Sequence, residues 1–334
     1  MIAAWSGSPV WLQLEAGRQA HHERYRQRVY AFLEKYHAAY RAEITRAADS
    51  LCRDDLLRPH LSPLAQALDQ YLYWLRWGGW LSAQLAPPLA LEAEEDARRL
   101  AVAVMTYLGA RLVDDGMDDH RDFKRKQVTV LGTLERLCPR GSPAALCCAS
   151  ALLGFWVLNH GQRRFRQLGL DVCADTTAQL FARIPPGALA EVVCGAAITR
   201  DEYARIVQRK AVAYDMILYQ NLLAPADPRS RGPLLAAVAI SSEIAQYLND
   251  LMDLEDDAGR RQLNLIRHGF ETPETFWAFC LERAASGLSA VEHLSQPLRD
   301  AAAAILAEVF EASLTLWGEE SPAAAMPASQ DSAS

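Results

Sequence analysis

Apolar residues recur at three- and four-residue steps along almost the whole chain, and this spacing constrains the possible folds more than any other feature. It places apolar side chains on one face of an α-helix. Alternating runs rich in Val, Ile and Thr, which would indicate strands, are missing from the sequence. The fold class that the sequence predicts is therefore all-α.

The same spacing predicts where the helices lie. They span residues 16–51, 64–85, 91–119, 128–138, 144–168, 174–183, 189–196, 200–223, 234–257, 273–288 and 298–317. Short turn sequences separate them, among them Pro87-Pro88, Pro185-Pro186-Gly187 and the Pro-containing stretches 139–143 and 224–228. None of these breaks resembles an interdomain linker, so we expect one helical domain over residues 1–318. Residues 319–334 are rich in Ser, Ala and Pro without apolar periodicity, which predicts a disordered tail.

Composition narrows the class of protein. The chain has 334 residues, of which 51% are hydrophobic, enough for one large core or two modest ones. A net charge of -7 without a sustained basic stripe argues against binding to nucleic acid. The longest apolar run, residues 144–158, is shorter than the ~20 residues that a membrane span needs, so we expect a buried core helix there. No basic segment precedes an apolar block at the N-terminus, so we expect no secretory signal and a cytoplasmic protein.

Two acidic clusters interrupt the apolar pattern. In the first, Asp114 and Asp118 are four residues apart; in the second, Asn249, Asp253 and Asp257 follow at four-residue steps. Each set therefore lines one face of a helix, where like charges at this spacing repel. We expect bound cations to neutralise them, and the oxygen-only ligands point to Mg²⁺ or Mn²⁺. Acidic runs are often solvated helix faces, and for the second cluster taken alone that alternative stays open.

The first cluster carries a family resemblance. Asp114-Asp115-x-x-Asp118 resembles the first aspartate-rich motif that trans-prenyl diphosphate synthases share with class I terpene synthases, two branches of the isoprenoid synthase superfamily. The resemblance runs from about residue 60 to residue 290. It implies a single large antiparallel helical bundle with a central active-site cavity, and a catalytic role for the three aspartates.

The second cluster fits both branches. Gln246-x-x-Asn249-Asp250-x-x-Asp253 is similar to the second motif of the prenyl synthases, with Asn249 in place of its first Asp. Asn249-Asp250-x-x-Asp253-x-x-x-Asp257 resembles the terpene synthase metal triad, with Asp253 where Ser or Thr is usual and Asp257 where Glu is usual. For Asp250, one residue off the ligand stripe, a capping role and direct metal contact both stay open.

Basic residues flank the second cluster on both sides. Upstream, Arg209-Lys210 resembles the segment that supplies a cation to the substrate diphosphate in both branches. Downstream, Arg260-Arg261 followed by Asn264 is similar to the basic element that follows the terpene synthase triad. The resemblance implies that these four basic residues bind the diphosphate.

The stretch that separates the two branches is Trp74 to Ser82. Prenyl synthases carry a Gly-Gly-Lys-x-Arg type element near this point for the isopentenyl diphosphate co-substrate. Here Gly78-Gly79 is present, but Trp80 and Ser82 occupy the basic positions. The loss of these anchors favours an enzyme with one diphosphate substrate.

The resemblance also implies the rest of the site. The metal is Mg²⁺, as three ions, with Mn²⁺ as an alternative, held by Asp114, Asp118, Asn249, Asp253 and Asp257. An apolar cavity would shield a carbocation, with aromatic faces stabilising it. The candidate aromatics are Tyr73, Trp74, Trp77, Trp80, Tyr107, Phe155, Trp156, Tyr214 and Tyr247. Enzymes of this kind commonly pair through exposed helices, so a homodimer is a further expectation.

The leading hypothesis is a class I terpene synthase that ionises and cyclises one prenyl diphosphate. Gly109 and Ala110, one turn before the first motif, are small, which favours geranylgeranyl over farnesyl diphosphate. The nearest alternative is a trans-prenyltransferase that adds isopentenyl diphosphate to an allylic primer. A third is a non-catalytic subunit of a prenyl synthase, which predicts decayed metal motifs.

Overall fold

The computed structural model describes most of the chain. The described residues are 7–53, 55–56, 58–60, 65, 68, 72–118, 122–123, 127–128, 130–137, 141–194, 199–252 and 273–317. The predicted tail, residues 319–334, and the residues from Asp253 to Thr272 lie outside them.

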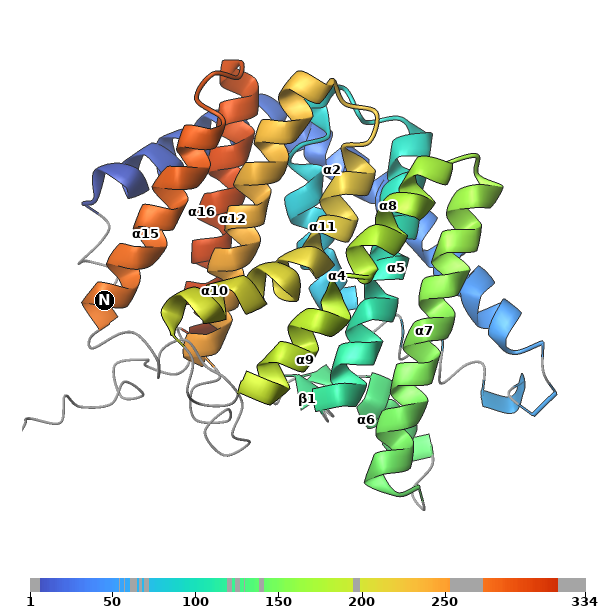
Figure 1. Ribbon diagram of the computed structural model, residues 1–334. Helices are drawn as coiled ribbons and strands as arrows, with labels where there is room; N and C mark the ends of the chain where they lie inside the picture. The colour runs from blue at the N-terminus through green and yellow to red at the C-terminus, as the bar shows by residue number, and fades with distance from the viewer. Residues whose placement is uncertain are drawn as a thin grey trace, which may run out of the picture. The chain divides into compact units, whose positions relative to one another are not determined.

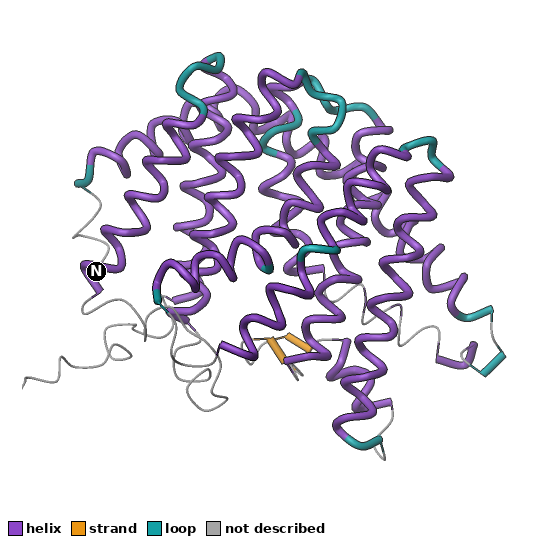
Figure 2. Tube along the Cα trace, in the orientation of Figure 1, coloured by secondary structure: helices purple, strands orange, loops and turns teal. Residues whose placement is uncertain are grey.

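The fold is all-α, as predicted (Figures 1 and 2). The helices are α2 (Pro9–Leu51), η1 (Arg58–His60), α4 (Leu72–Ala83), η2 (Pro87–Leu89), α5 (Glu94–Asp118), α6 (Val130–Leu137), α7 (Pro143–Gln167), α8 (Asp171–Phe181), α9 (Ile184–Cys194), α10 (Arg200–Arg209), α11 (Ala211–Leu222), α12 (Pro228–Met252), α15 (Pro273–Ala290) and α16 (Gln296–Trp317). One short antiparallel pair, β1 (Asp122–Phe123) with β2 (Gln127–Val128), joins α5 to α6. The sequence did not predict this pair, because two-residue strands are too short to show an alternating pattern.

Contacts divide the chain into two compact units, which are described separately. Unit 1 comprises Met1–Arg26, Ala182–Met216 and Ala226–Ser334, and unit 2 comprises Gln27–Phe181 and Ile217–Pro225. Helices α2 and α11 contribute residues to both units.

In unit 2, helices α5 and α7 lie backbone against backbone. A Cβ added to Gly154 of α7 would lie 2.5 Å from the carbonyl oxygen of Gly109 in α5, and one added to Gly109 would lie 2.8 Å from that of Gly154. Gly116 meets the Cys147 carbonyl oxygen in the same way. The Ser150 hydroxyl donates to the Leu112 carbonyl oxygen at 2.9 Å, which adds a polar tie across the contact. These small residues allow the two helices to approach more closely than larger side chains would.

Helix α7 is buried along one side only. Leu152 and Phe155, on its other side, are 69% and 45% exposed. By length and composition alone, α7 is able to cross a membrane, a criterion that core helices of soluble proteins also meet, and 33% of its most apolar window is buried. The predicted core helix at residues 144–158 is therefore a helix with one buried face.

In unit 1, α12, α15 and α16 lie side by side (Figure 1). Ala301 to Ala304 of α16 are all buried. A Cβ added to Gly17 of α2 would lie 2.5 Å from the Ala303 Cβ, and the Trp11 ring meets the Phe310 ring edge-on at 5.8 Å. Small residues on both helices thus let the start of α2 pack closely against α16.

Several predicted boundaries are wrong: α2 begins at Pro9 and not at residue 16, and α12 begins at Pro228 and not at residue 234. The single helix predicted over residues 200–223 is two helices, because the chain breaks at Lys210, whose φ and ψ are -101° and -80°. The predicted break at Pro185-Pro186-Gly187 lies inside the first turn of α9, which begins at Ile184. Prolines are tolerated in a first turn because the N–H groups there have no partner within the helix.

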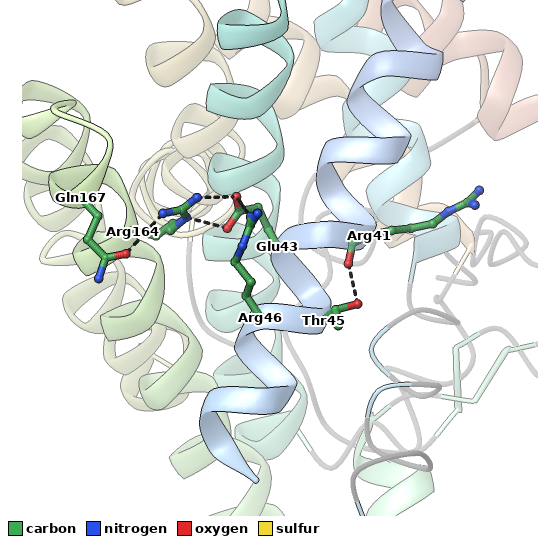
Figure 3. A network of polar contacts seen from close by, with 6 residues as sticks. All are labelled: Arg41, Glu43, Thr45, Arg46, Arg164 and Gln167. Atoms are coloured by element: carbon green, nitrogen blue, oxygen red, sulfur yellow. Dashed lines mark hydrogen bonds and ion pairs between the residues drawn. The ribbon is translucent and has the colours of Figure 1, made fainter. Parts of the chain in front are cut away.

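A buried carboxylate ties α2 to α7 within unit 2 (Figure 3). Glu43, whose side chain is 1% exposed, accepts hydrogen bonds from Arg164 Nε at 2.8 Å and from Arg164 Nη2 at 3.2 Å. Arg46 also donates to Glu43 at 2.6 Å, but its side chain is 53% exposed. The two-pronged pair with Arg164 is therefore the contact that couples the helices.

We expect Glu43→Gln to lower the free energy of unfolding by about 3 kcal/mol, because it leaves the Arg164 guanidinium facing an uncharged partner in a buried position. Arg46→Ala, which removes only the exposed partner, should cost about 0.5 kcal/mol or less. Urea denaturation of both variants measures the difference, and equal costs would contradict the role given to Arg164.

A second test concerns the contact between α5 and α7. Gly154→Ala should destabilise the protein by about 1–3 kcal/mol, because the new methyl group meets backbone that has no room to move aside. Gly7→Ala is the control, since a Cβ at Gly7 meets nothing within 4 Å and Gly7 does not precede a proline. That change should be neutral or stabilise by up to about 1 kcal/mol. Thermal unfolding of the two variants distinguishes close contact from a general intolerance of alanine.

Candidate functional site

The first acidic motif lies at the C-terminal end of α5. Asp114 and Asp115 are buried, at 4% and 1% exposure, and Asp118 is the last residue of the helix. The negative end of the helix dipole disfavours carboxylates at this position, and the described helix has no basic residue in its last turn. A cation nearby would therefore stabilise buried carboxylates at this end. The side chain of Asp118 lies outside the described residues.

One cation is supplied by α5 itself. Arg111 Nη1 donates to Asp114 Oδ2 at 2.8 Å, and Arg111 Nη2 lies 3.6 Å from Asp115 Oδ1. The Arg111 side chain is 24% exposed. Sequence analysis missed this residue, although the signal was present: a basic residue three and four positions before two acidic ones shares their side of a helix.

The second motif begins on α12, in unit 1. Asp250 is 2% exposed and accepts hydrogen bonds from the Tyr203 hydroxyl of α10 and from Gln246 Nε2 at 2.8 Å. Asn249, beside it, is half-buried. Sequence analysis left the role of Asp250 open, and the structure gives it a helix-joining role: it connects α10 to α12 next to Asn249.

A further network holds α12 against α15. Glu243 is 3% exposed and accepts from Arg283 Nη2 at 2.5 Å and from the Tyr247 hydroxyl at 3.1 Å. Burial, together with the Glu243 carboxylate, raises the pKa of Tyr247, so the phenol stays protonated and donates. Tyr247 is 1% exposed, and its ring lies 5.3 Å from that of Phe279. Tyr247 thus has a packing and hydrogen-bonding role in addition to its predicted place in the cavity lining.

The predicted diphosphate-binding cations Arg209 and Lys210 lie at the break between α10 and α11. Arg209 is exposed and Lys210 is half-buried. The Thr199 side chain and Glu202 form a capping box that fixes the start of α10. Gly187 of α9 approaches the break so closely that a Cβ there would lie 3.0 Å from the Arg209 Cβ. The capping box at the start of α10 and the contact with Gly187 of α9 therefore determine where the backbone turns at Arg209 and Lys210.

The predicted cavity aromatics fall in different environments. Tyr214 is 3% exposed, Tyr107 is half-buried, and the Trp80 ring lies 5.6 Å from that of Tyr30. Phe155 is 45% exposed, with its ring edge-on to Phe181 at 6.0 Å. Trp156 stacks on His160 at 5.2 Å and lines a surface pocket of about 400 Å³ with Asn159, Gln162, Arg163 and Arg166. The side chains of Tyr73, Trp74 and Trp77 lie outside the described residues.

In the stretch from Trp74 to Ser82, which distinguishes prenyl synthases from terpene synthases, the two glycines are explained by helix packing. A Cβ at Gly78 would lie 2.7 Å from Leu218 Cδ1, and one at Gly79 would lie 2.7 Å from the Tyr36 ring. Ser82 is completely buried. The glycine pair therefore lets α4 pack against its neighbours in unit 2, and the Ser82 position offers no exposed surface for an anion.

The predicted metal ligands lie only in part within the described residues. Among the described residues, no group of three or more His, Cys, Asp or Glu side chains is placed to hold a metal ion. Asp253, Asp257, Arg260 and Arg261 lie outside those residues. The buried carboxylates at the end of α5 are hard oxygen donors, which suit Mg²⁺.

Comparisons with known proteins add little. No protein-family model and no curated protein matches the chain. One similar solved structure is the crystal structure of octaprenyl pyrophosphate synthase from Helicobacter pylori, with a TM-score of 0.43 and 12% sequence identity over 88% of this chain and 98% of that chain. A likeness this distant does not show what the chain does.

The link between Tyr203 and Asp250 can be tested directly. Tyr203→Phe removes one hydrogen bond to a buried carboxylate and should lower the free energy of unfolding by about 1.5–3 kcal/mol. Gln208→Ala, at an exposed position of the same helix, should change it by less than about 0.5 kcal/mol. Chemical denaturation of both variants provides the measurement. A Tyr203→Phe protein as stable as the wild type would show that the hydroxyl does not hold Asp250.

Proposed function

We propose that the chain is a class I terpene synthase, which ionises one linear prenyl diphosphate and cyclises it with release of diphosphate. The observation that carries the proposal is the pair of acidic motifs, of which the first is buried at the negative end of a helix. A solvated acidic face, the simplest alternative for such a cluster, would be exposed. Asp114 and Asp115 are instead buried, with Arg111 beside them.

The predicted site residues would bind either the metal ions or the diphosphate. Asp114, Asp118, Asn249, Asp253 and Asp257 would hold Mg²⁺, or Mn²⁺ in its place. The bound ions supply Lewis-acid polarisation of the diphosphate leaving group. The anion itself would be bound by the basic residues Arg209, Lys210, Arg260 and Arg261 through charge-assisted hydrogen bonds.

Other residues would fix these groups and protect the reaction. Tyr203, by holding Asp250, would fix the backbone that presents Asn249. Buried aromatic side chains such as Tyr214 would exclude water from the carbocation and stabilise it by cation–π attraction, worth ~2 kcal/mol or more when desolvated.

The features of α4 support a one-substrate enzyme. Ser82 is completely buried, and Trp80 packs beside Tyr30, so neither replaces a basic anchor for a second diphosphate. The glycine pair before them has a packing role. A prenyl synthase that needs isopentenyl diphosphate would lack its cations here.

One observation favours the second candidate, a trans-prenyltransferase. Gln246, the residue that marks the prenyl synthase form of the second motif, donates to Asp250 and so has a defined place in the site. The alternative is therefore kept, with isopentenyl diphosphate as its co-substrate.

The packing of Gly109 bears on the chain length of the prenyl diphosphate substrate. The small residues Gly109 and Ala110 favour geranylgeranyl diphosphate in the sequence, but in the structure Gly109 lies against the α7 backbone. Its size therefore has a reason unrelated to the substrate. Farnesyl and geranylgeranyl diphosphate are both retained as substrates to be tested.

The proposal is tested by incubating the purified protein with Mg²⁺ and geranyl, farnesyl or geranylgeranyl diphosphate, each with and without isopentenyl diphosphate. We expect a hydrocarbon or alcohol without the co-substrate, detected by mass spectrometry. Asp114→Asn should abolish this product, because it removes a carboxylate ligand. Glu95→Gln, which changes an exposed acid in the first turn of the same helix, should retain it.

The outcomes separate the two candidates. A longer diphosphate that forms only with isopentenyl diphosphate would make the protein a prenyltransferase. No product from any substrate would leave the non-catalytic subunit as the remaining hypothesis.

A further inference from the structure

We propose that Arg111 is an internal counter-ion of the first acidic motif. Arg111 holds Asp114 and Asp115 in the metal-free protein and weakens their binding of Mg²⁺. The inference rests on the proposed function for the presence of a metal. It goes beyond that function in assigning a regulatory residue that sets how readily the site takes up the ion.

The contact lies within one helix. The guanidinium of Arg111 bonds to Asp114 at 2.8 Å and lies 3.6 Å from Asp115. All three residues belong to α5, three and four positions apart, so their proximity follows from helical geometry alone. It holds however the two units of the protein are arranged.

The surroundings make this pairing strong. The side chains of Asp114 and Asp115 are 6% and 1% exposed, and that of Arg111 is 24% exposed. At such burial, charges interact through a medium that screens them less than water does. The carboxylates sit where the helix dipole opposes them, so the positive charge of Arg111 compensates a local excess of negative charge.

A generic role in helix stability explains the pair less well. An acid that precedes a base by four residues stabilises a helix more than the reverse order, and here the base precedes the acids. The acids in the first turn of α5, by contrast, stand at the favourable end of the dipole. Arg111 is therefore placed for the charges of the motif and not for the helix as such.

The consequence concerns metal affinity. A Mg²⁺ ion that binds Asp114 must share its carboxylate with the guanidinium or displace it, and the two cations repel at this range. Removing the positive charge should strengthen Mg²⁺ binding while weakening the metal-free fold. A residue that only supported the fold would weaken both.

The test is Mg²⁺ titration by calorimetry, without substrate, of the wild type, Arg111→Met, Arg111→Lys and Asp114→Asn. We expect Arg111→Met to bind Mg²⁺ about tenfold more tightly than the wild type. Arg111→Lys keeps the charge and should stay within about threefold of the wild type. Arg98→Met, at an exposed arginine of the same helix, is the control for a change of net charge and should bind as the wild type does.

Thermal unfolding provides a second readout. Arg111→Met should melt below the wild type in chelator, and added Mg²⁺ should raise its melting temperature by more than that of the wild type. This arm remains informative if the variant is partly unfolded without metal, because Mg²⁺ should then restore the fold.

The outcomes separate this inference from the proposed function. If the wild type binds Mg²⁺, Asp114→Asn does not, and Arg111→Met binds no more tightly, the counter-ion role is overturned while the metal site stands. The same holds if Arg111→Lys binds as tightly as Arg111→Met, since charge would then not be the cause. If neither the wild type nor Arg111→Met binds Mg²⁺, this inference is overturned, while the proposed function is decided separately by product formation from the prenyl diphosphates.

Discussion

The backbone contact between α5 and α7 is the constraint on which the arrangement of the first motif depends. Gly109, Gly116 and Gly154 allow the two helices to touch without intervening side chains. The contact fixes α5 in rotation as well as in distance, because only its glycine-bearing side can approach so closely. Helical geometry then places Arg111 and Asp114 on the opposite side of α5. The orientation of the acidic motif thus follows from small residues that carry no chemistry.

A second constraint is electrostatic. The motif concentrates carboxylates at the end of a helix whose dipole repels them, and it buries two of them. Such an arrangement costs stability unless cations are present, so a chain that retains it is expected to use it. In the second motif, Asp250 accepts hydrogen bonds from two neutral donors, Tyr203 and Gln246. Neutral donors fix a carboxylate without competing for a metal as a cation does.

Much of the fold could be predicted from the sequence, because apolar residues recur at three- and four-residue steps along the helices. Residues 144–168 were predicted as helical, and α7 spans Pro143–Gln167. The break at Lys210 could not be predicted, since lysine favours helices and the apolar spacing continues on both sides. Tertiary contacts such as the close approach of Gly187 have no signature in local sequence. Arg111 was not predicted because it lies outside the acidic motif, and only its spacing, three and four residues before Asp114 and Asp115, marks it as their partner.

Glycines show most clearly where sequence reasoning about the site reaches its limit. A glycine next to a motif is compatible with space for a substrate, with close approach of an anion, or with helix packing, and sequence alone does not separate these. What decides is the atom that an added Cβ would meet. For Gly109 that atom belongs to the α7 backbone, and for Gly79 it belongs to the Tyr36 ring, so both have packing reasons. These two glycines are therefore not evidence on substrate length or on a second diphosphate. Ser82, which is buried where a basic anchor would stand, is the stronger evidence against a second diphosphate.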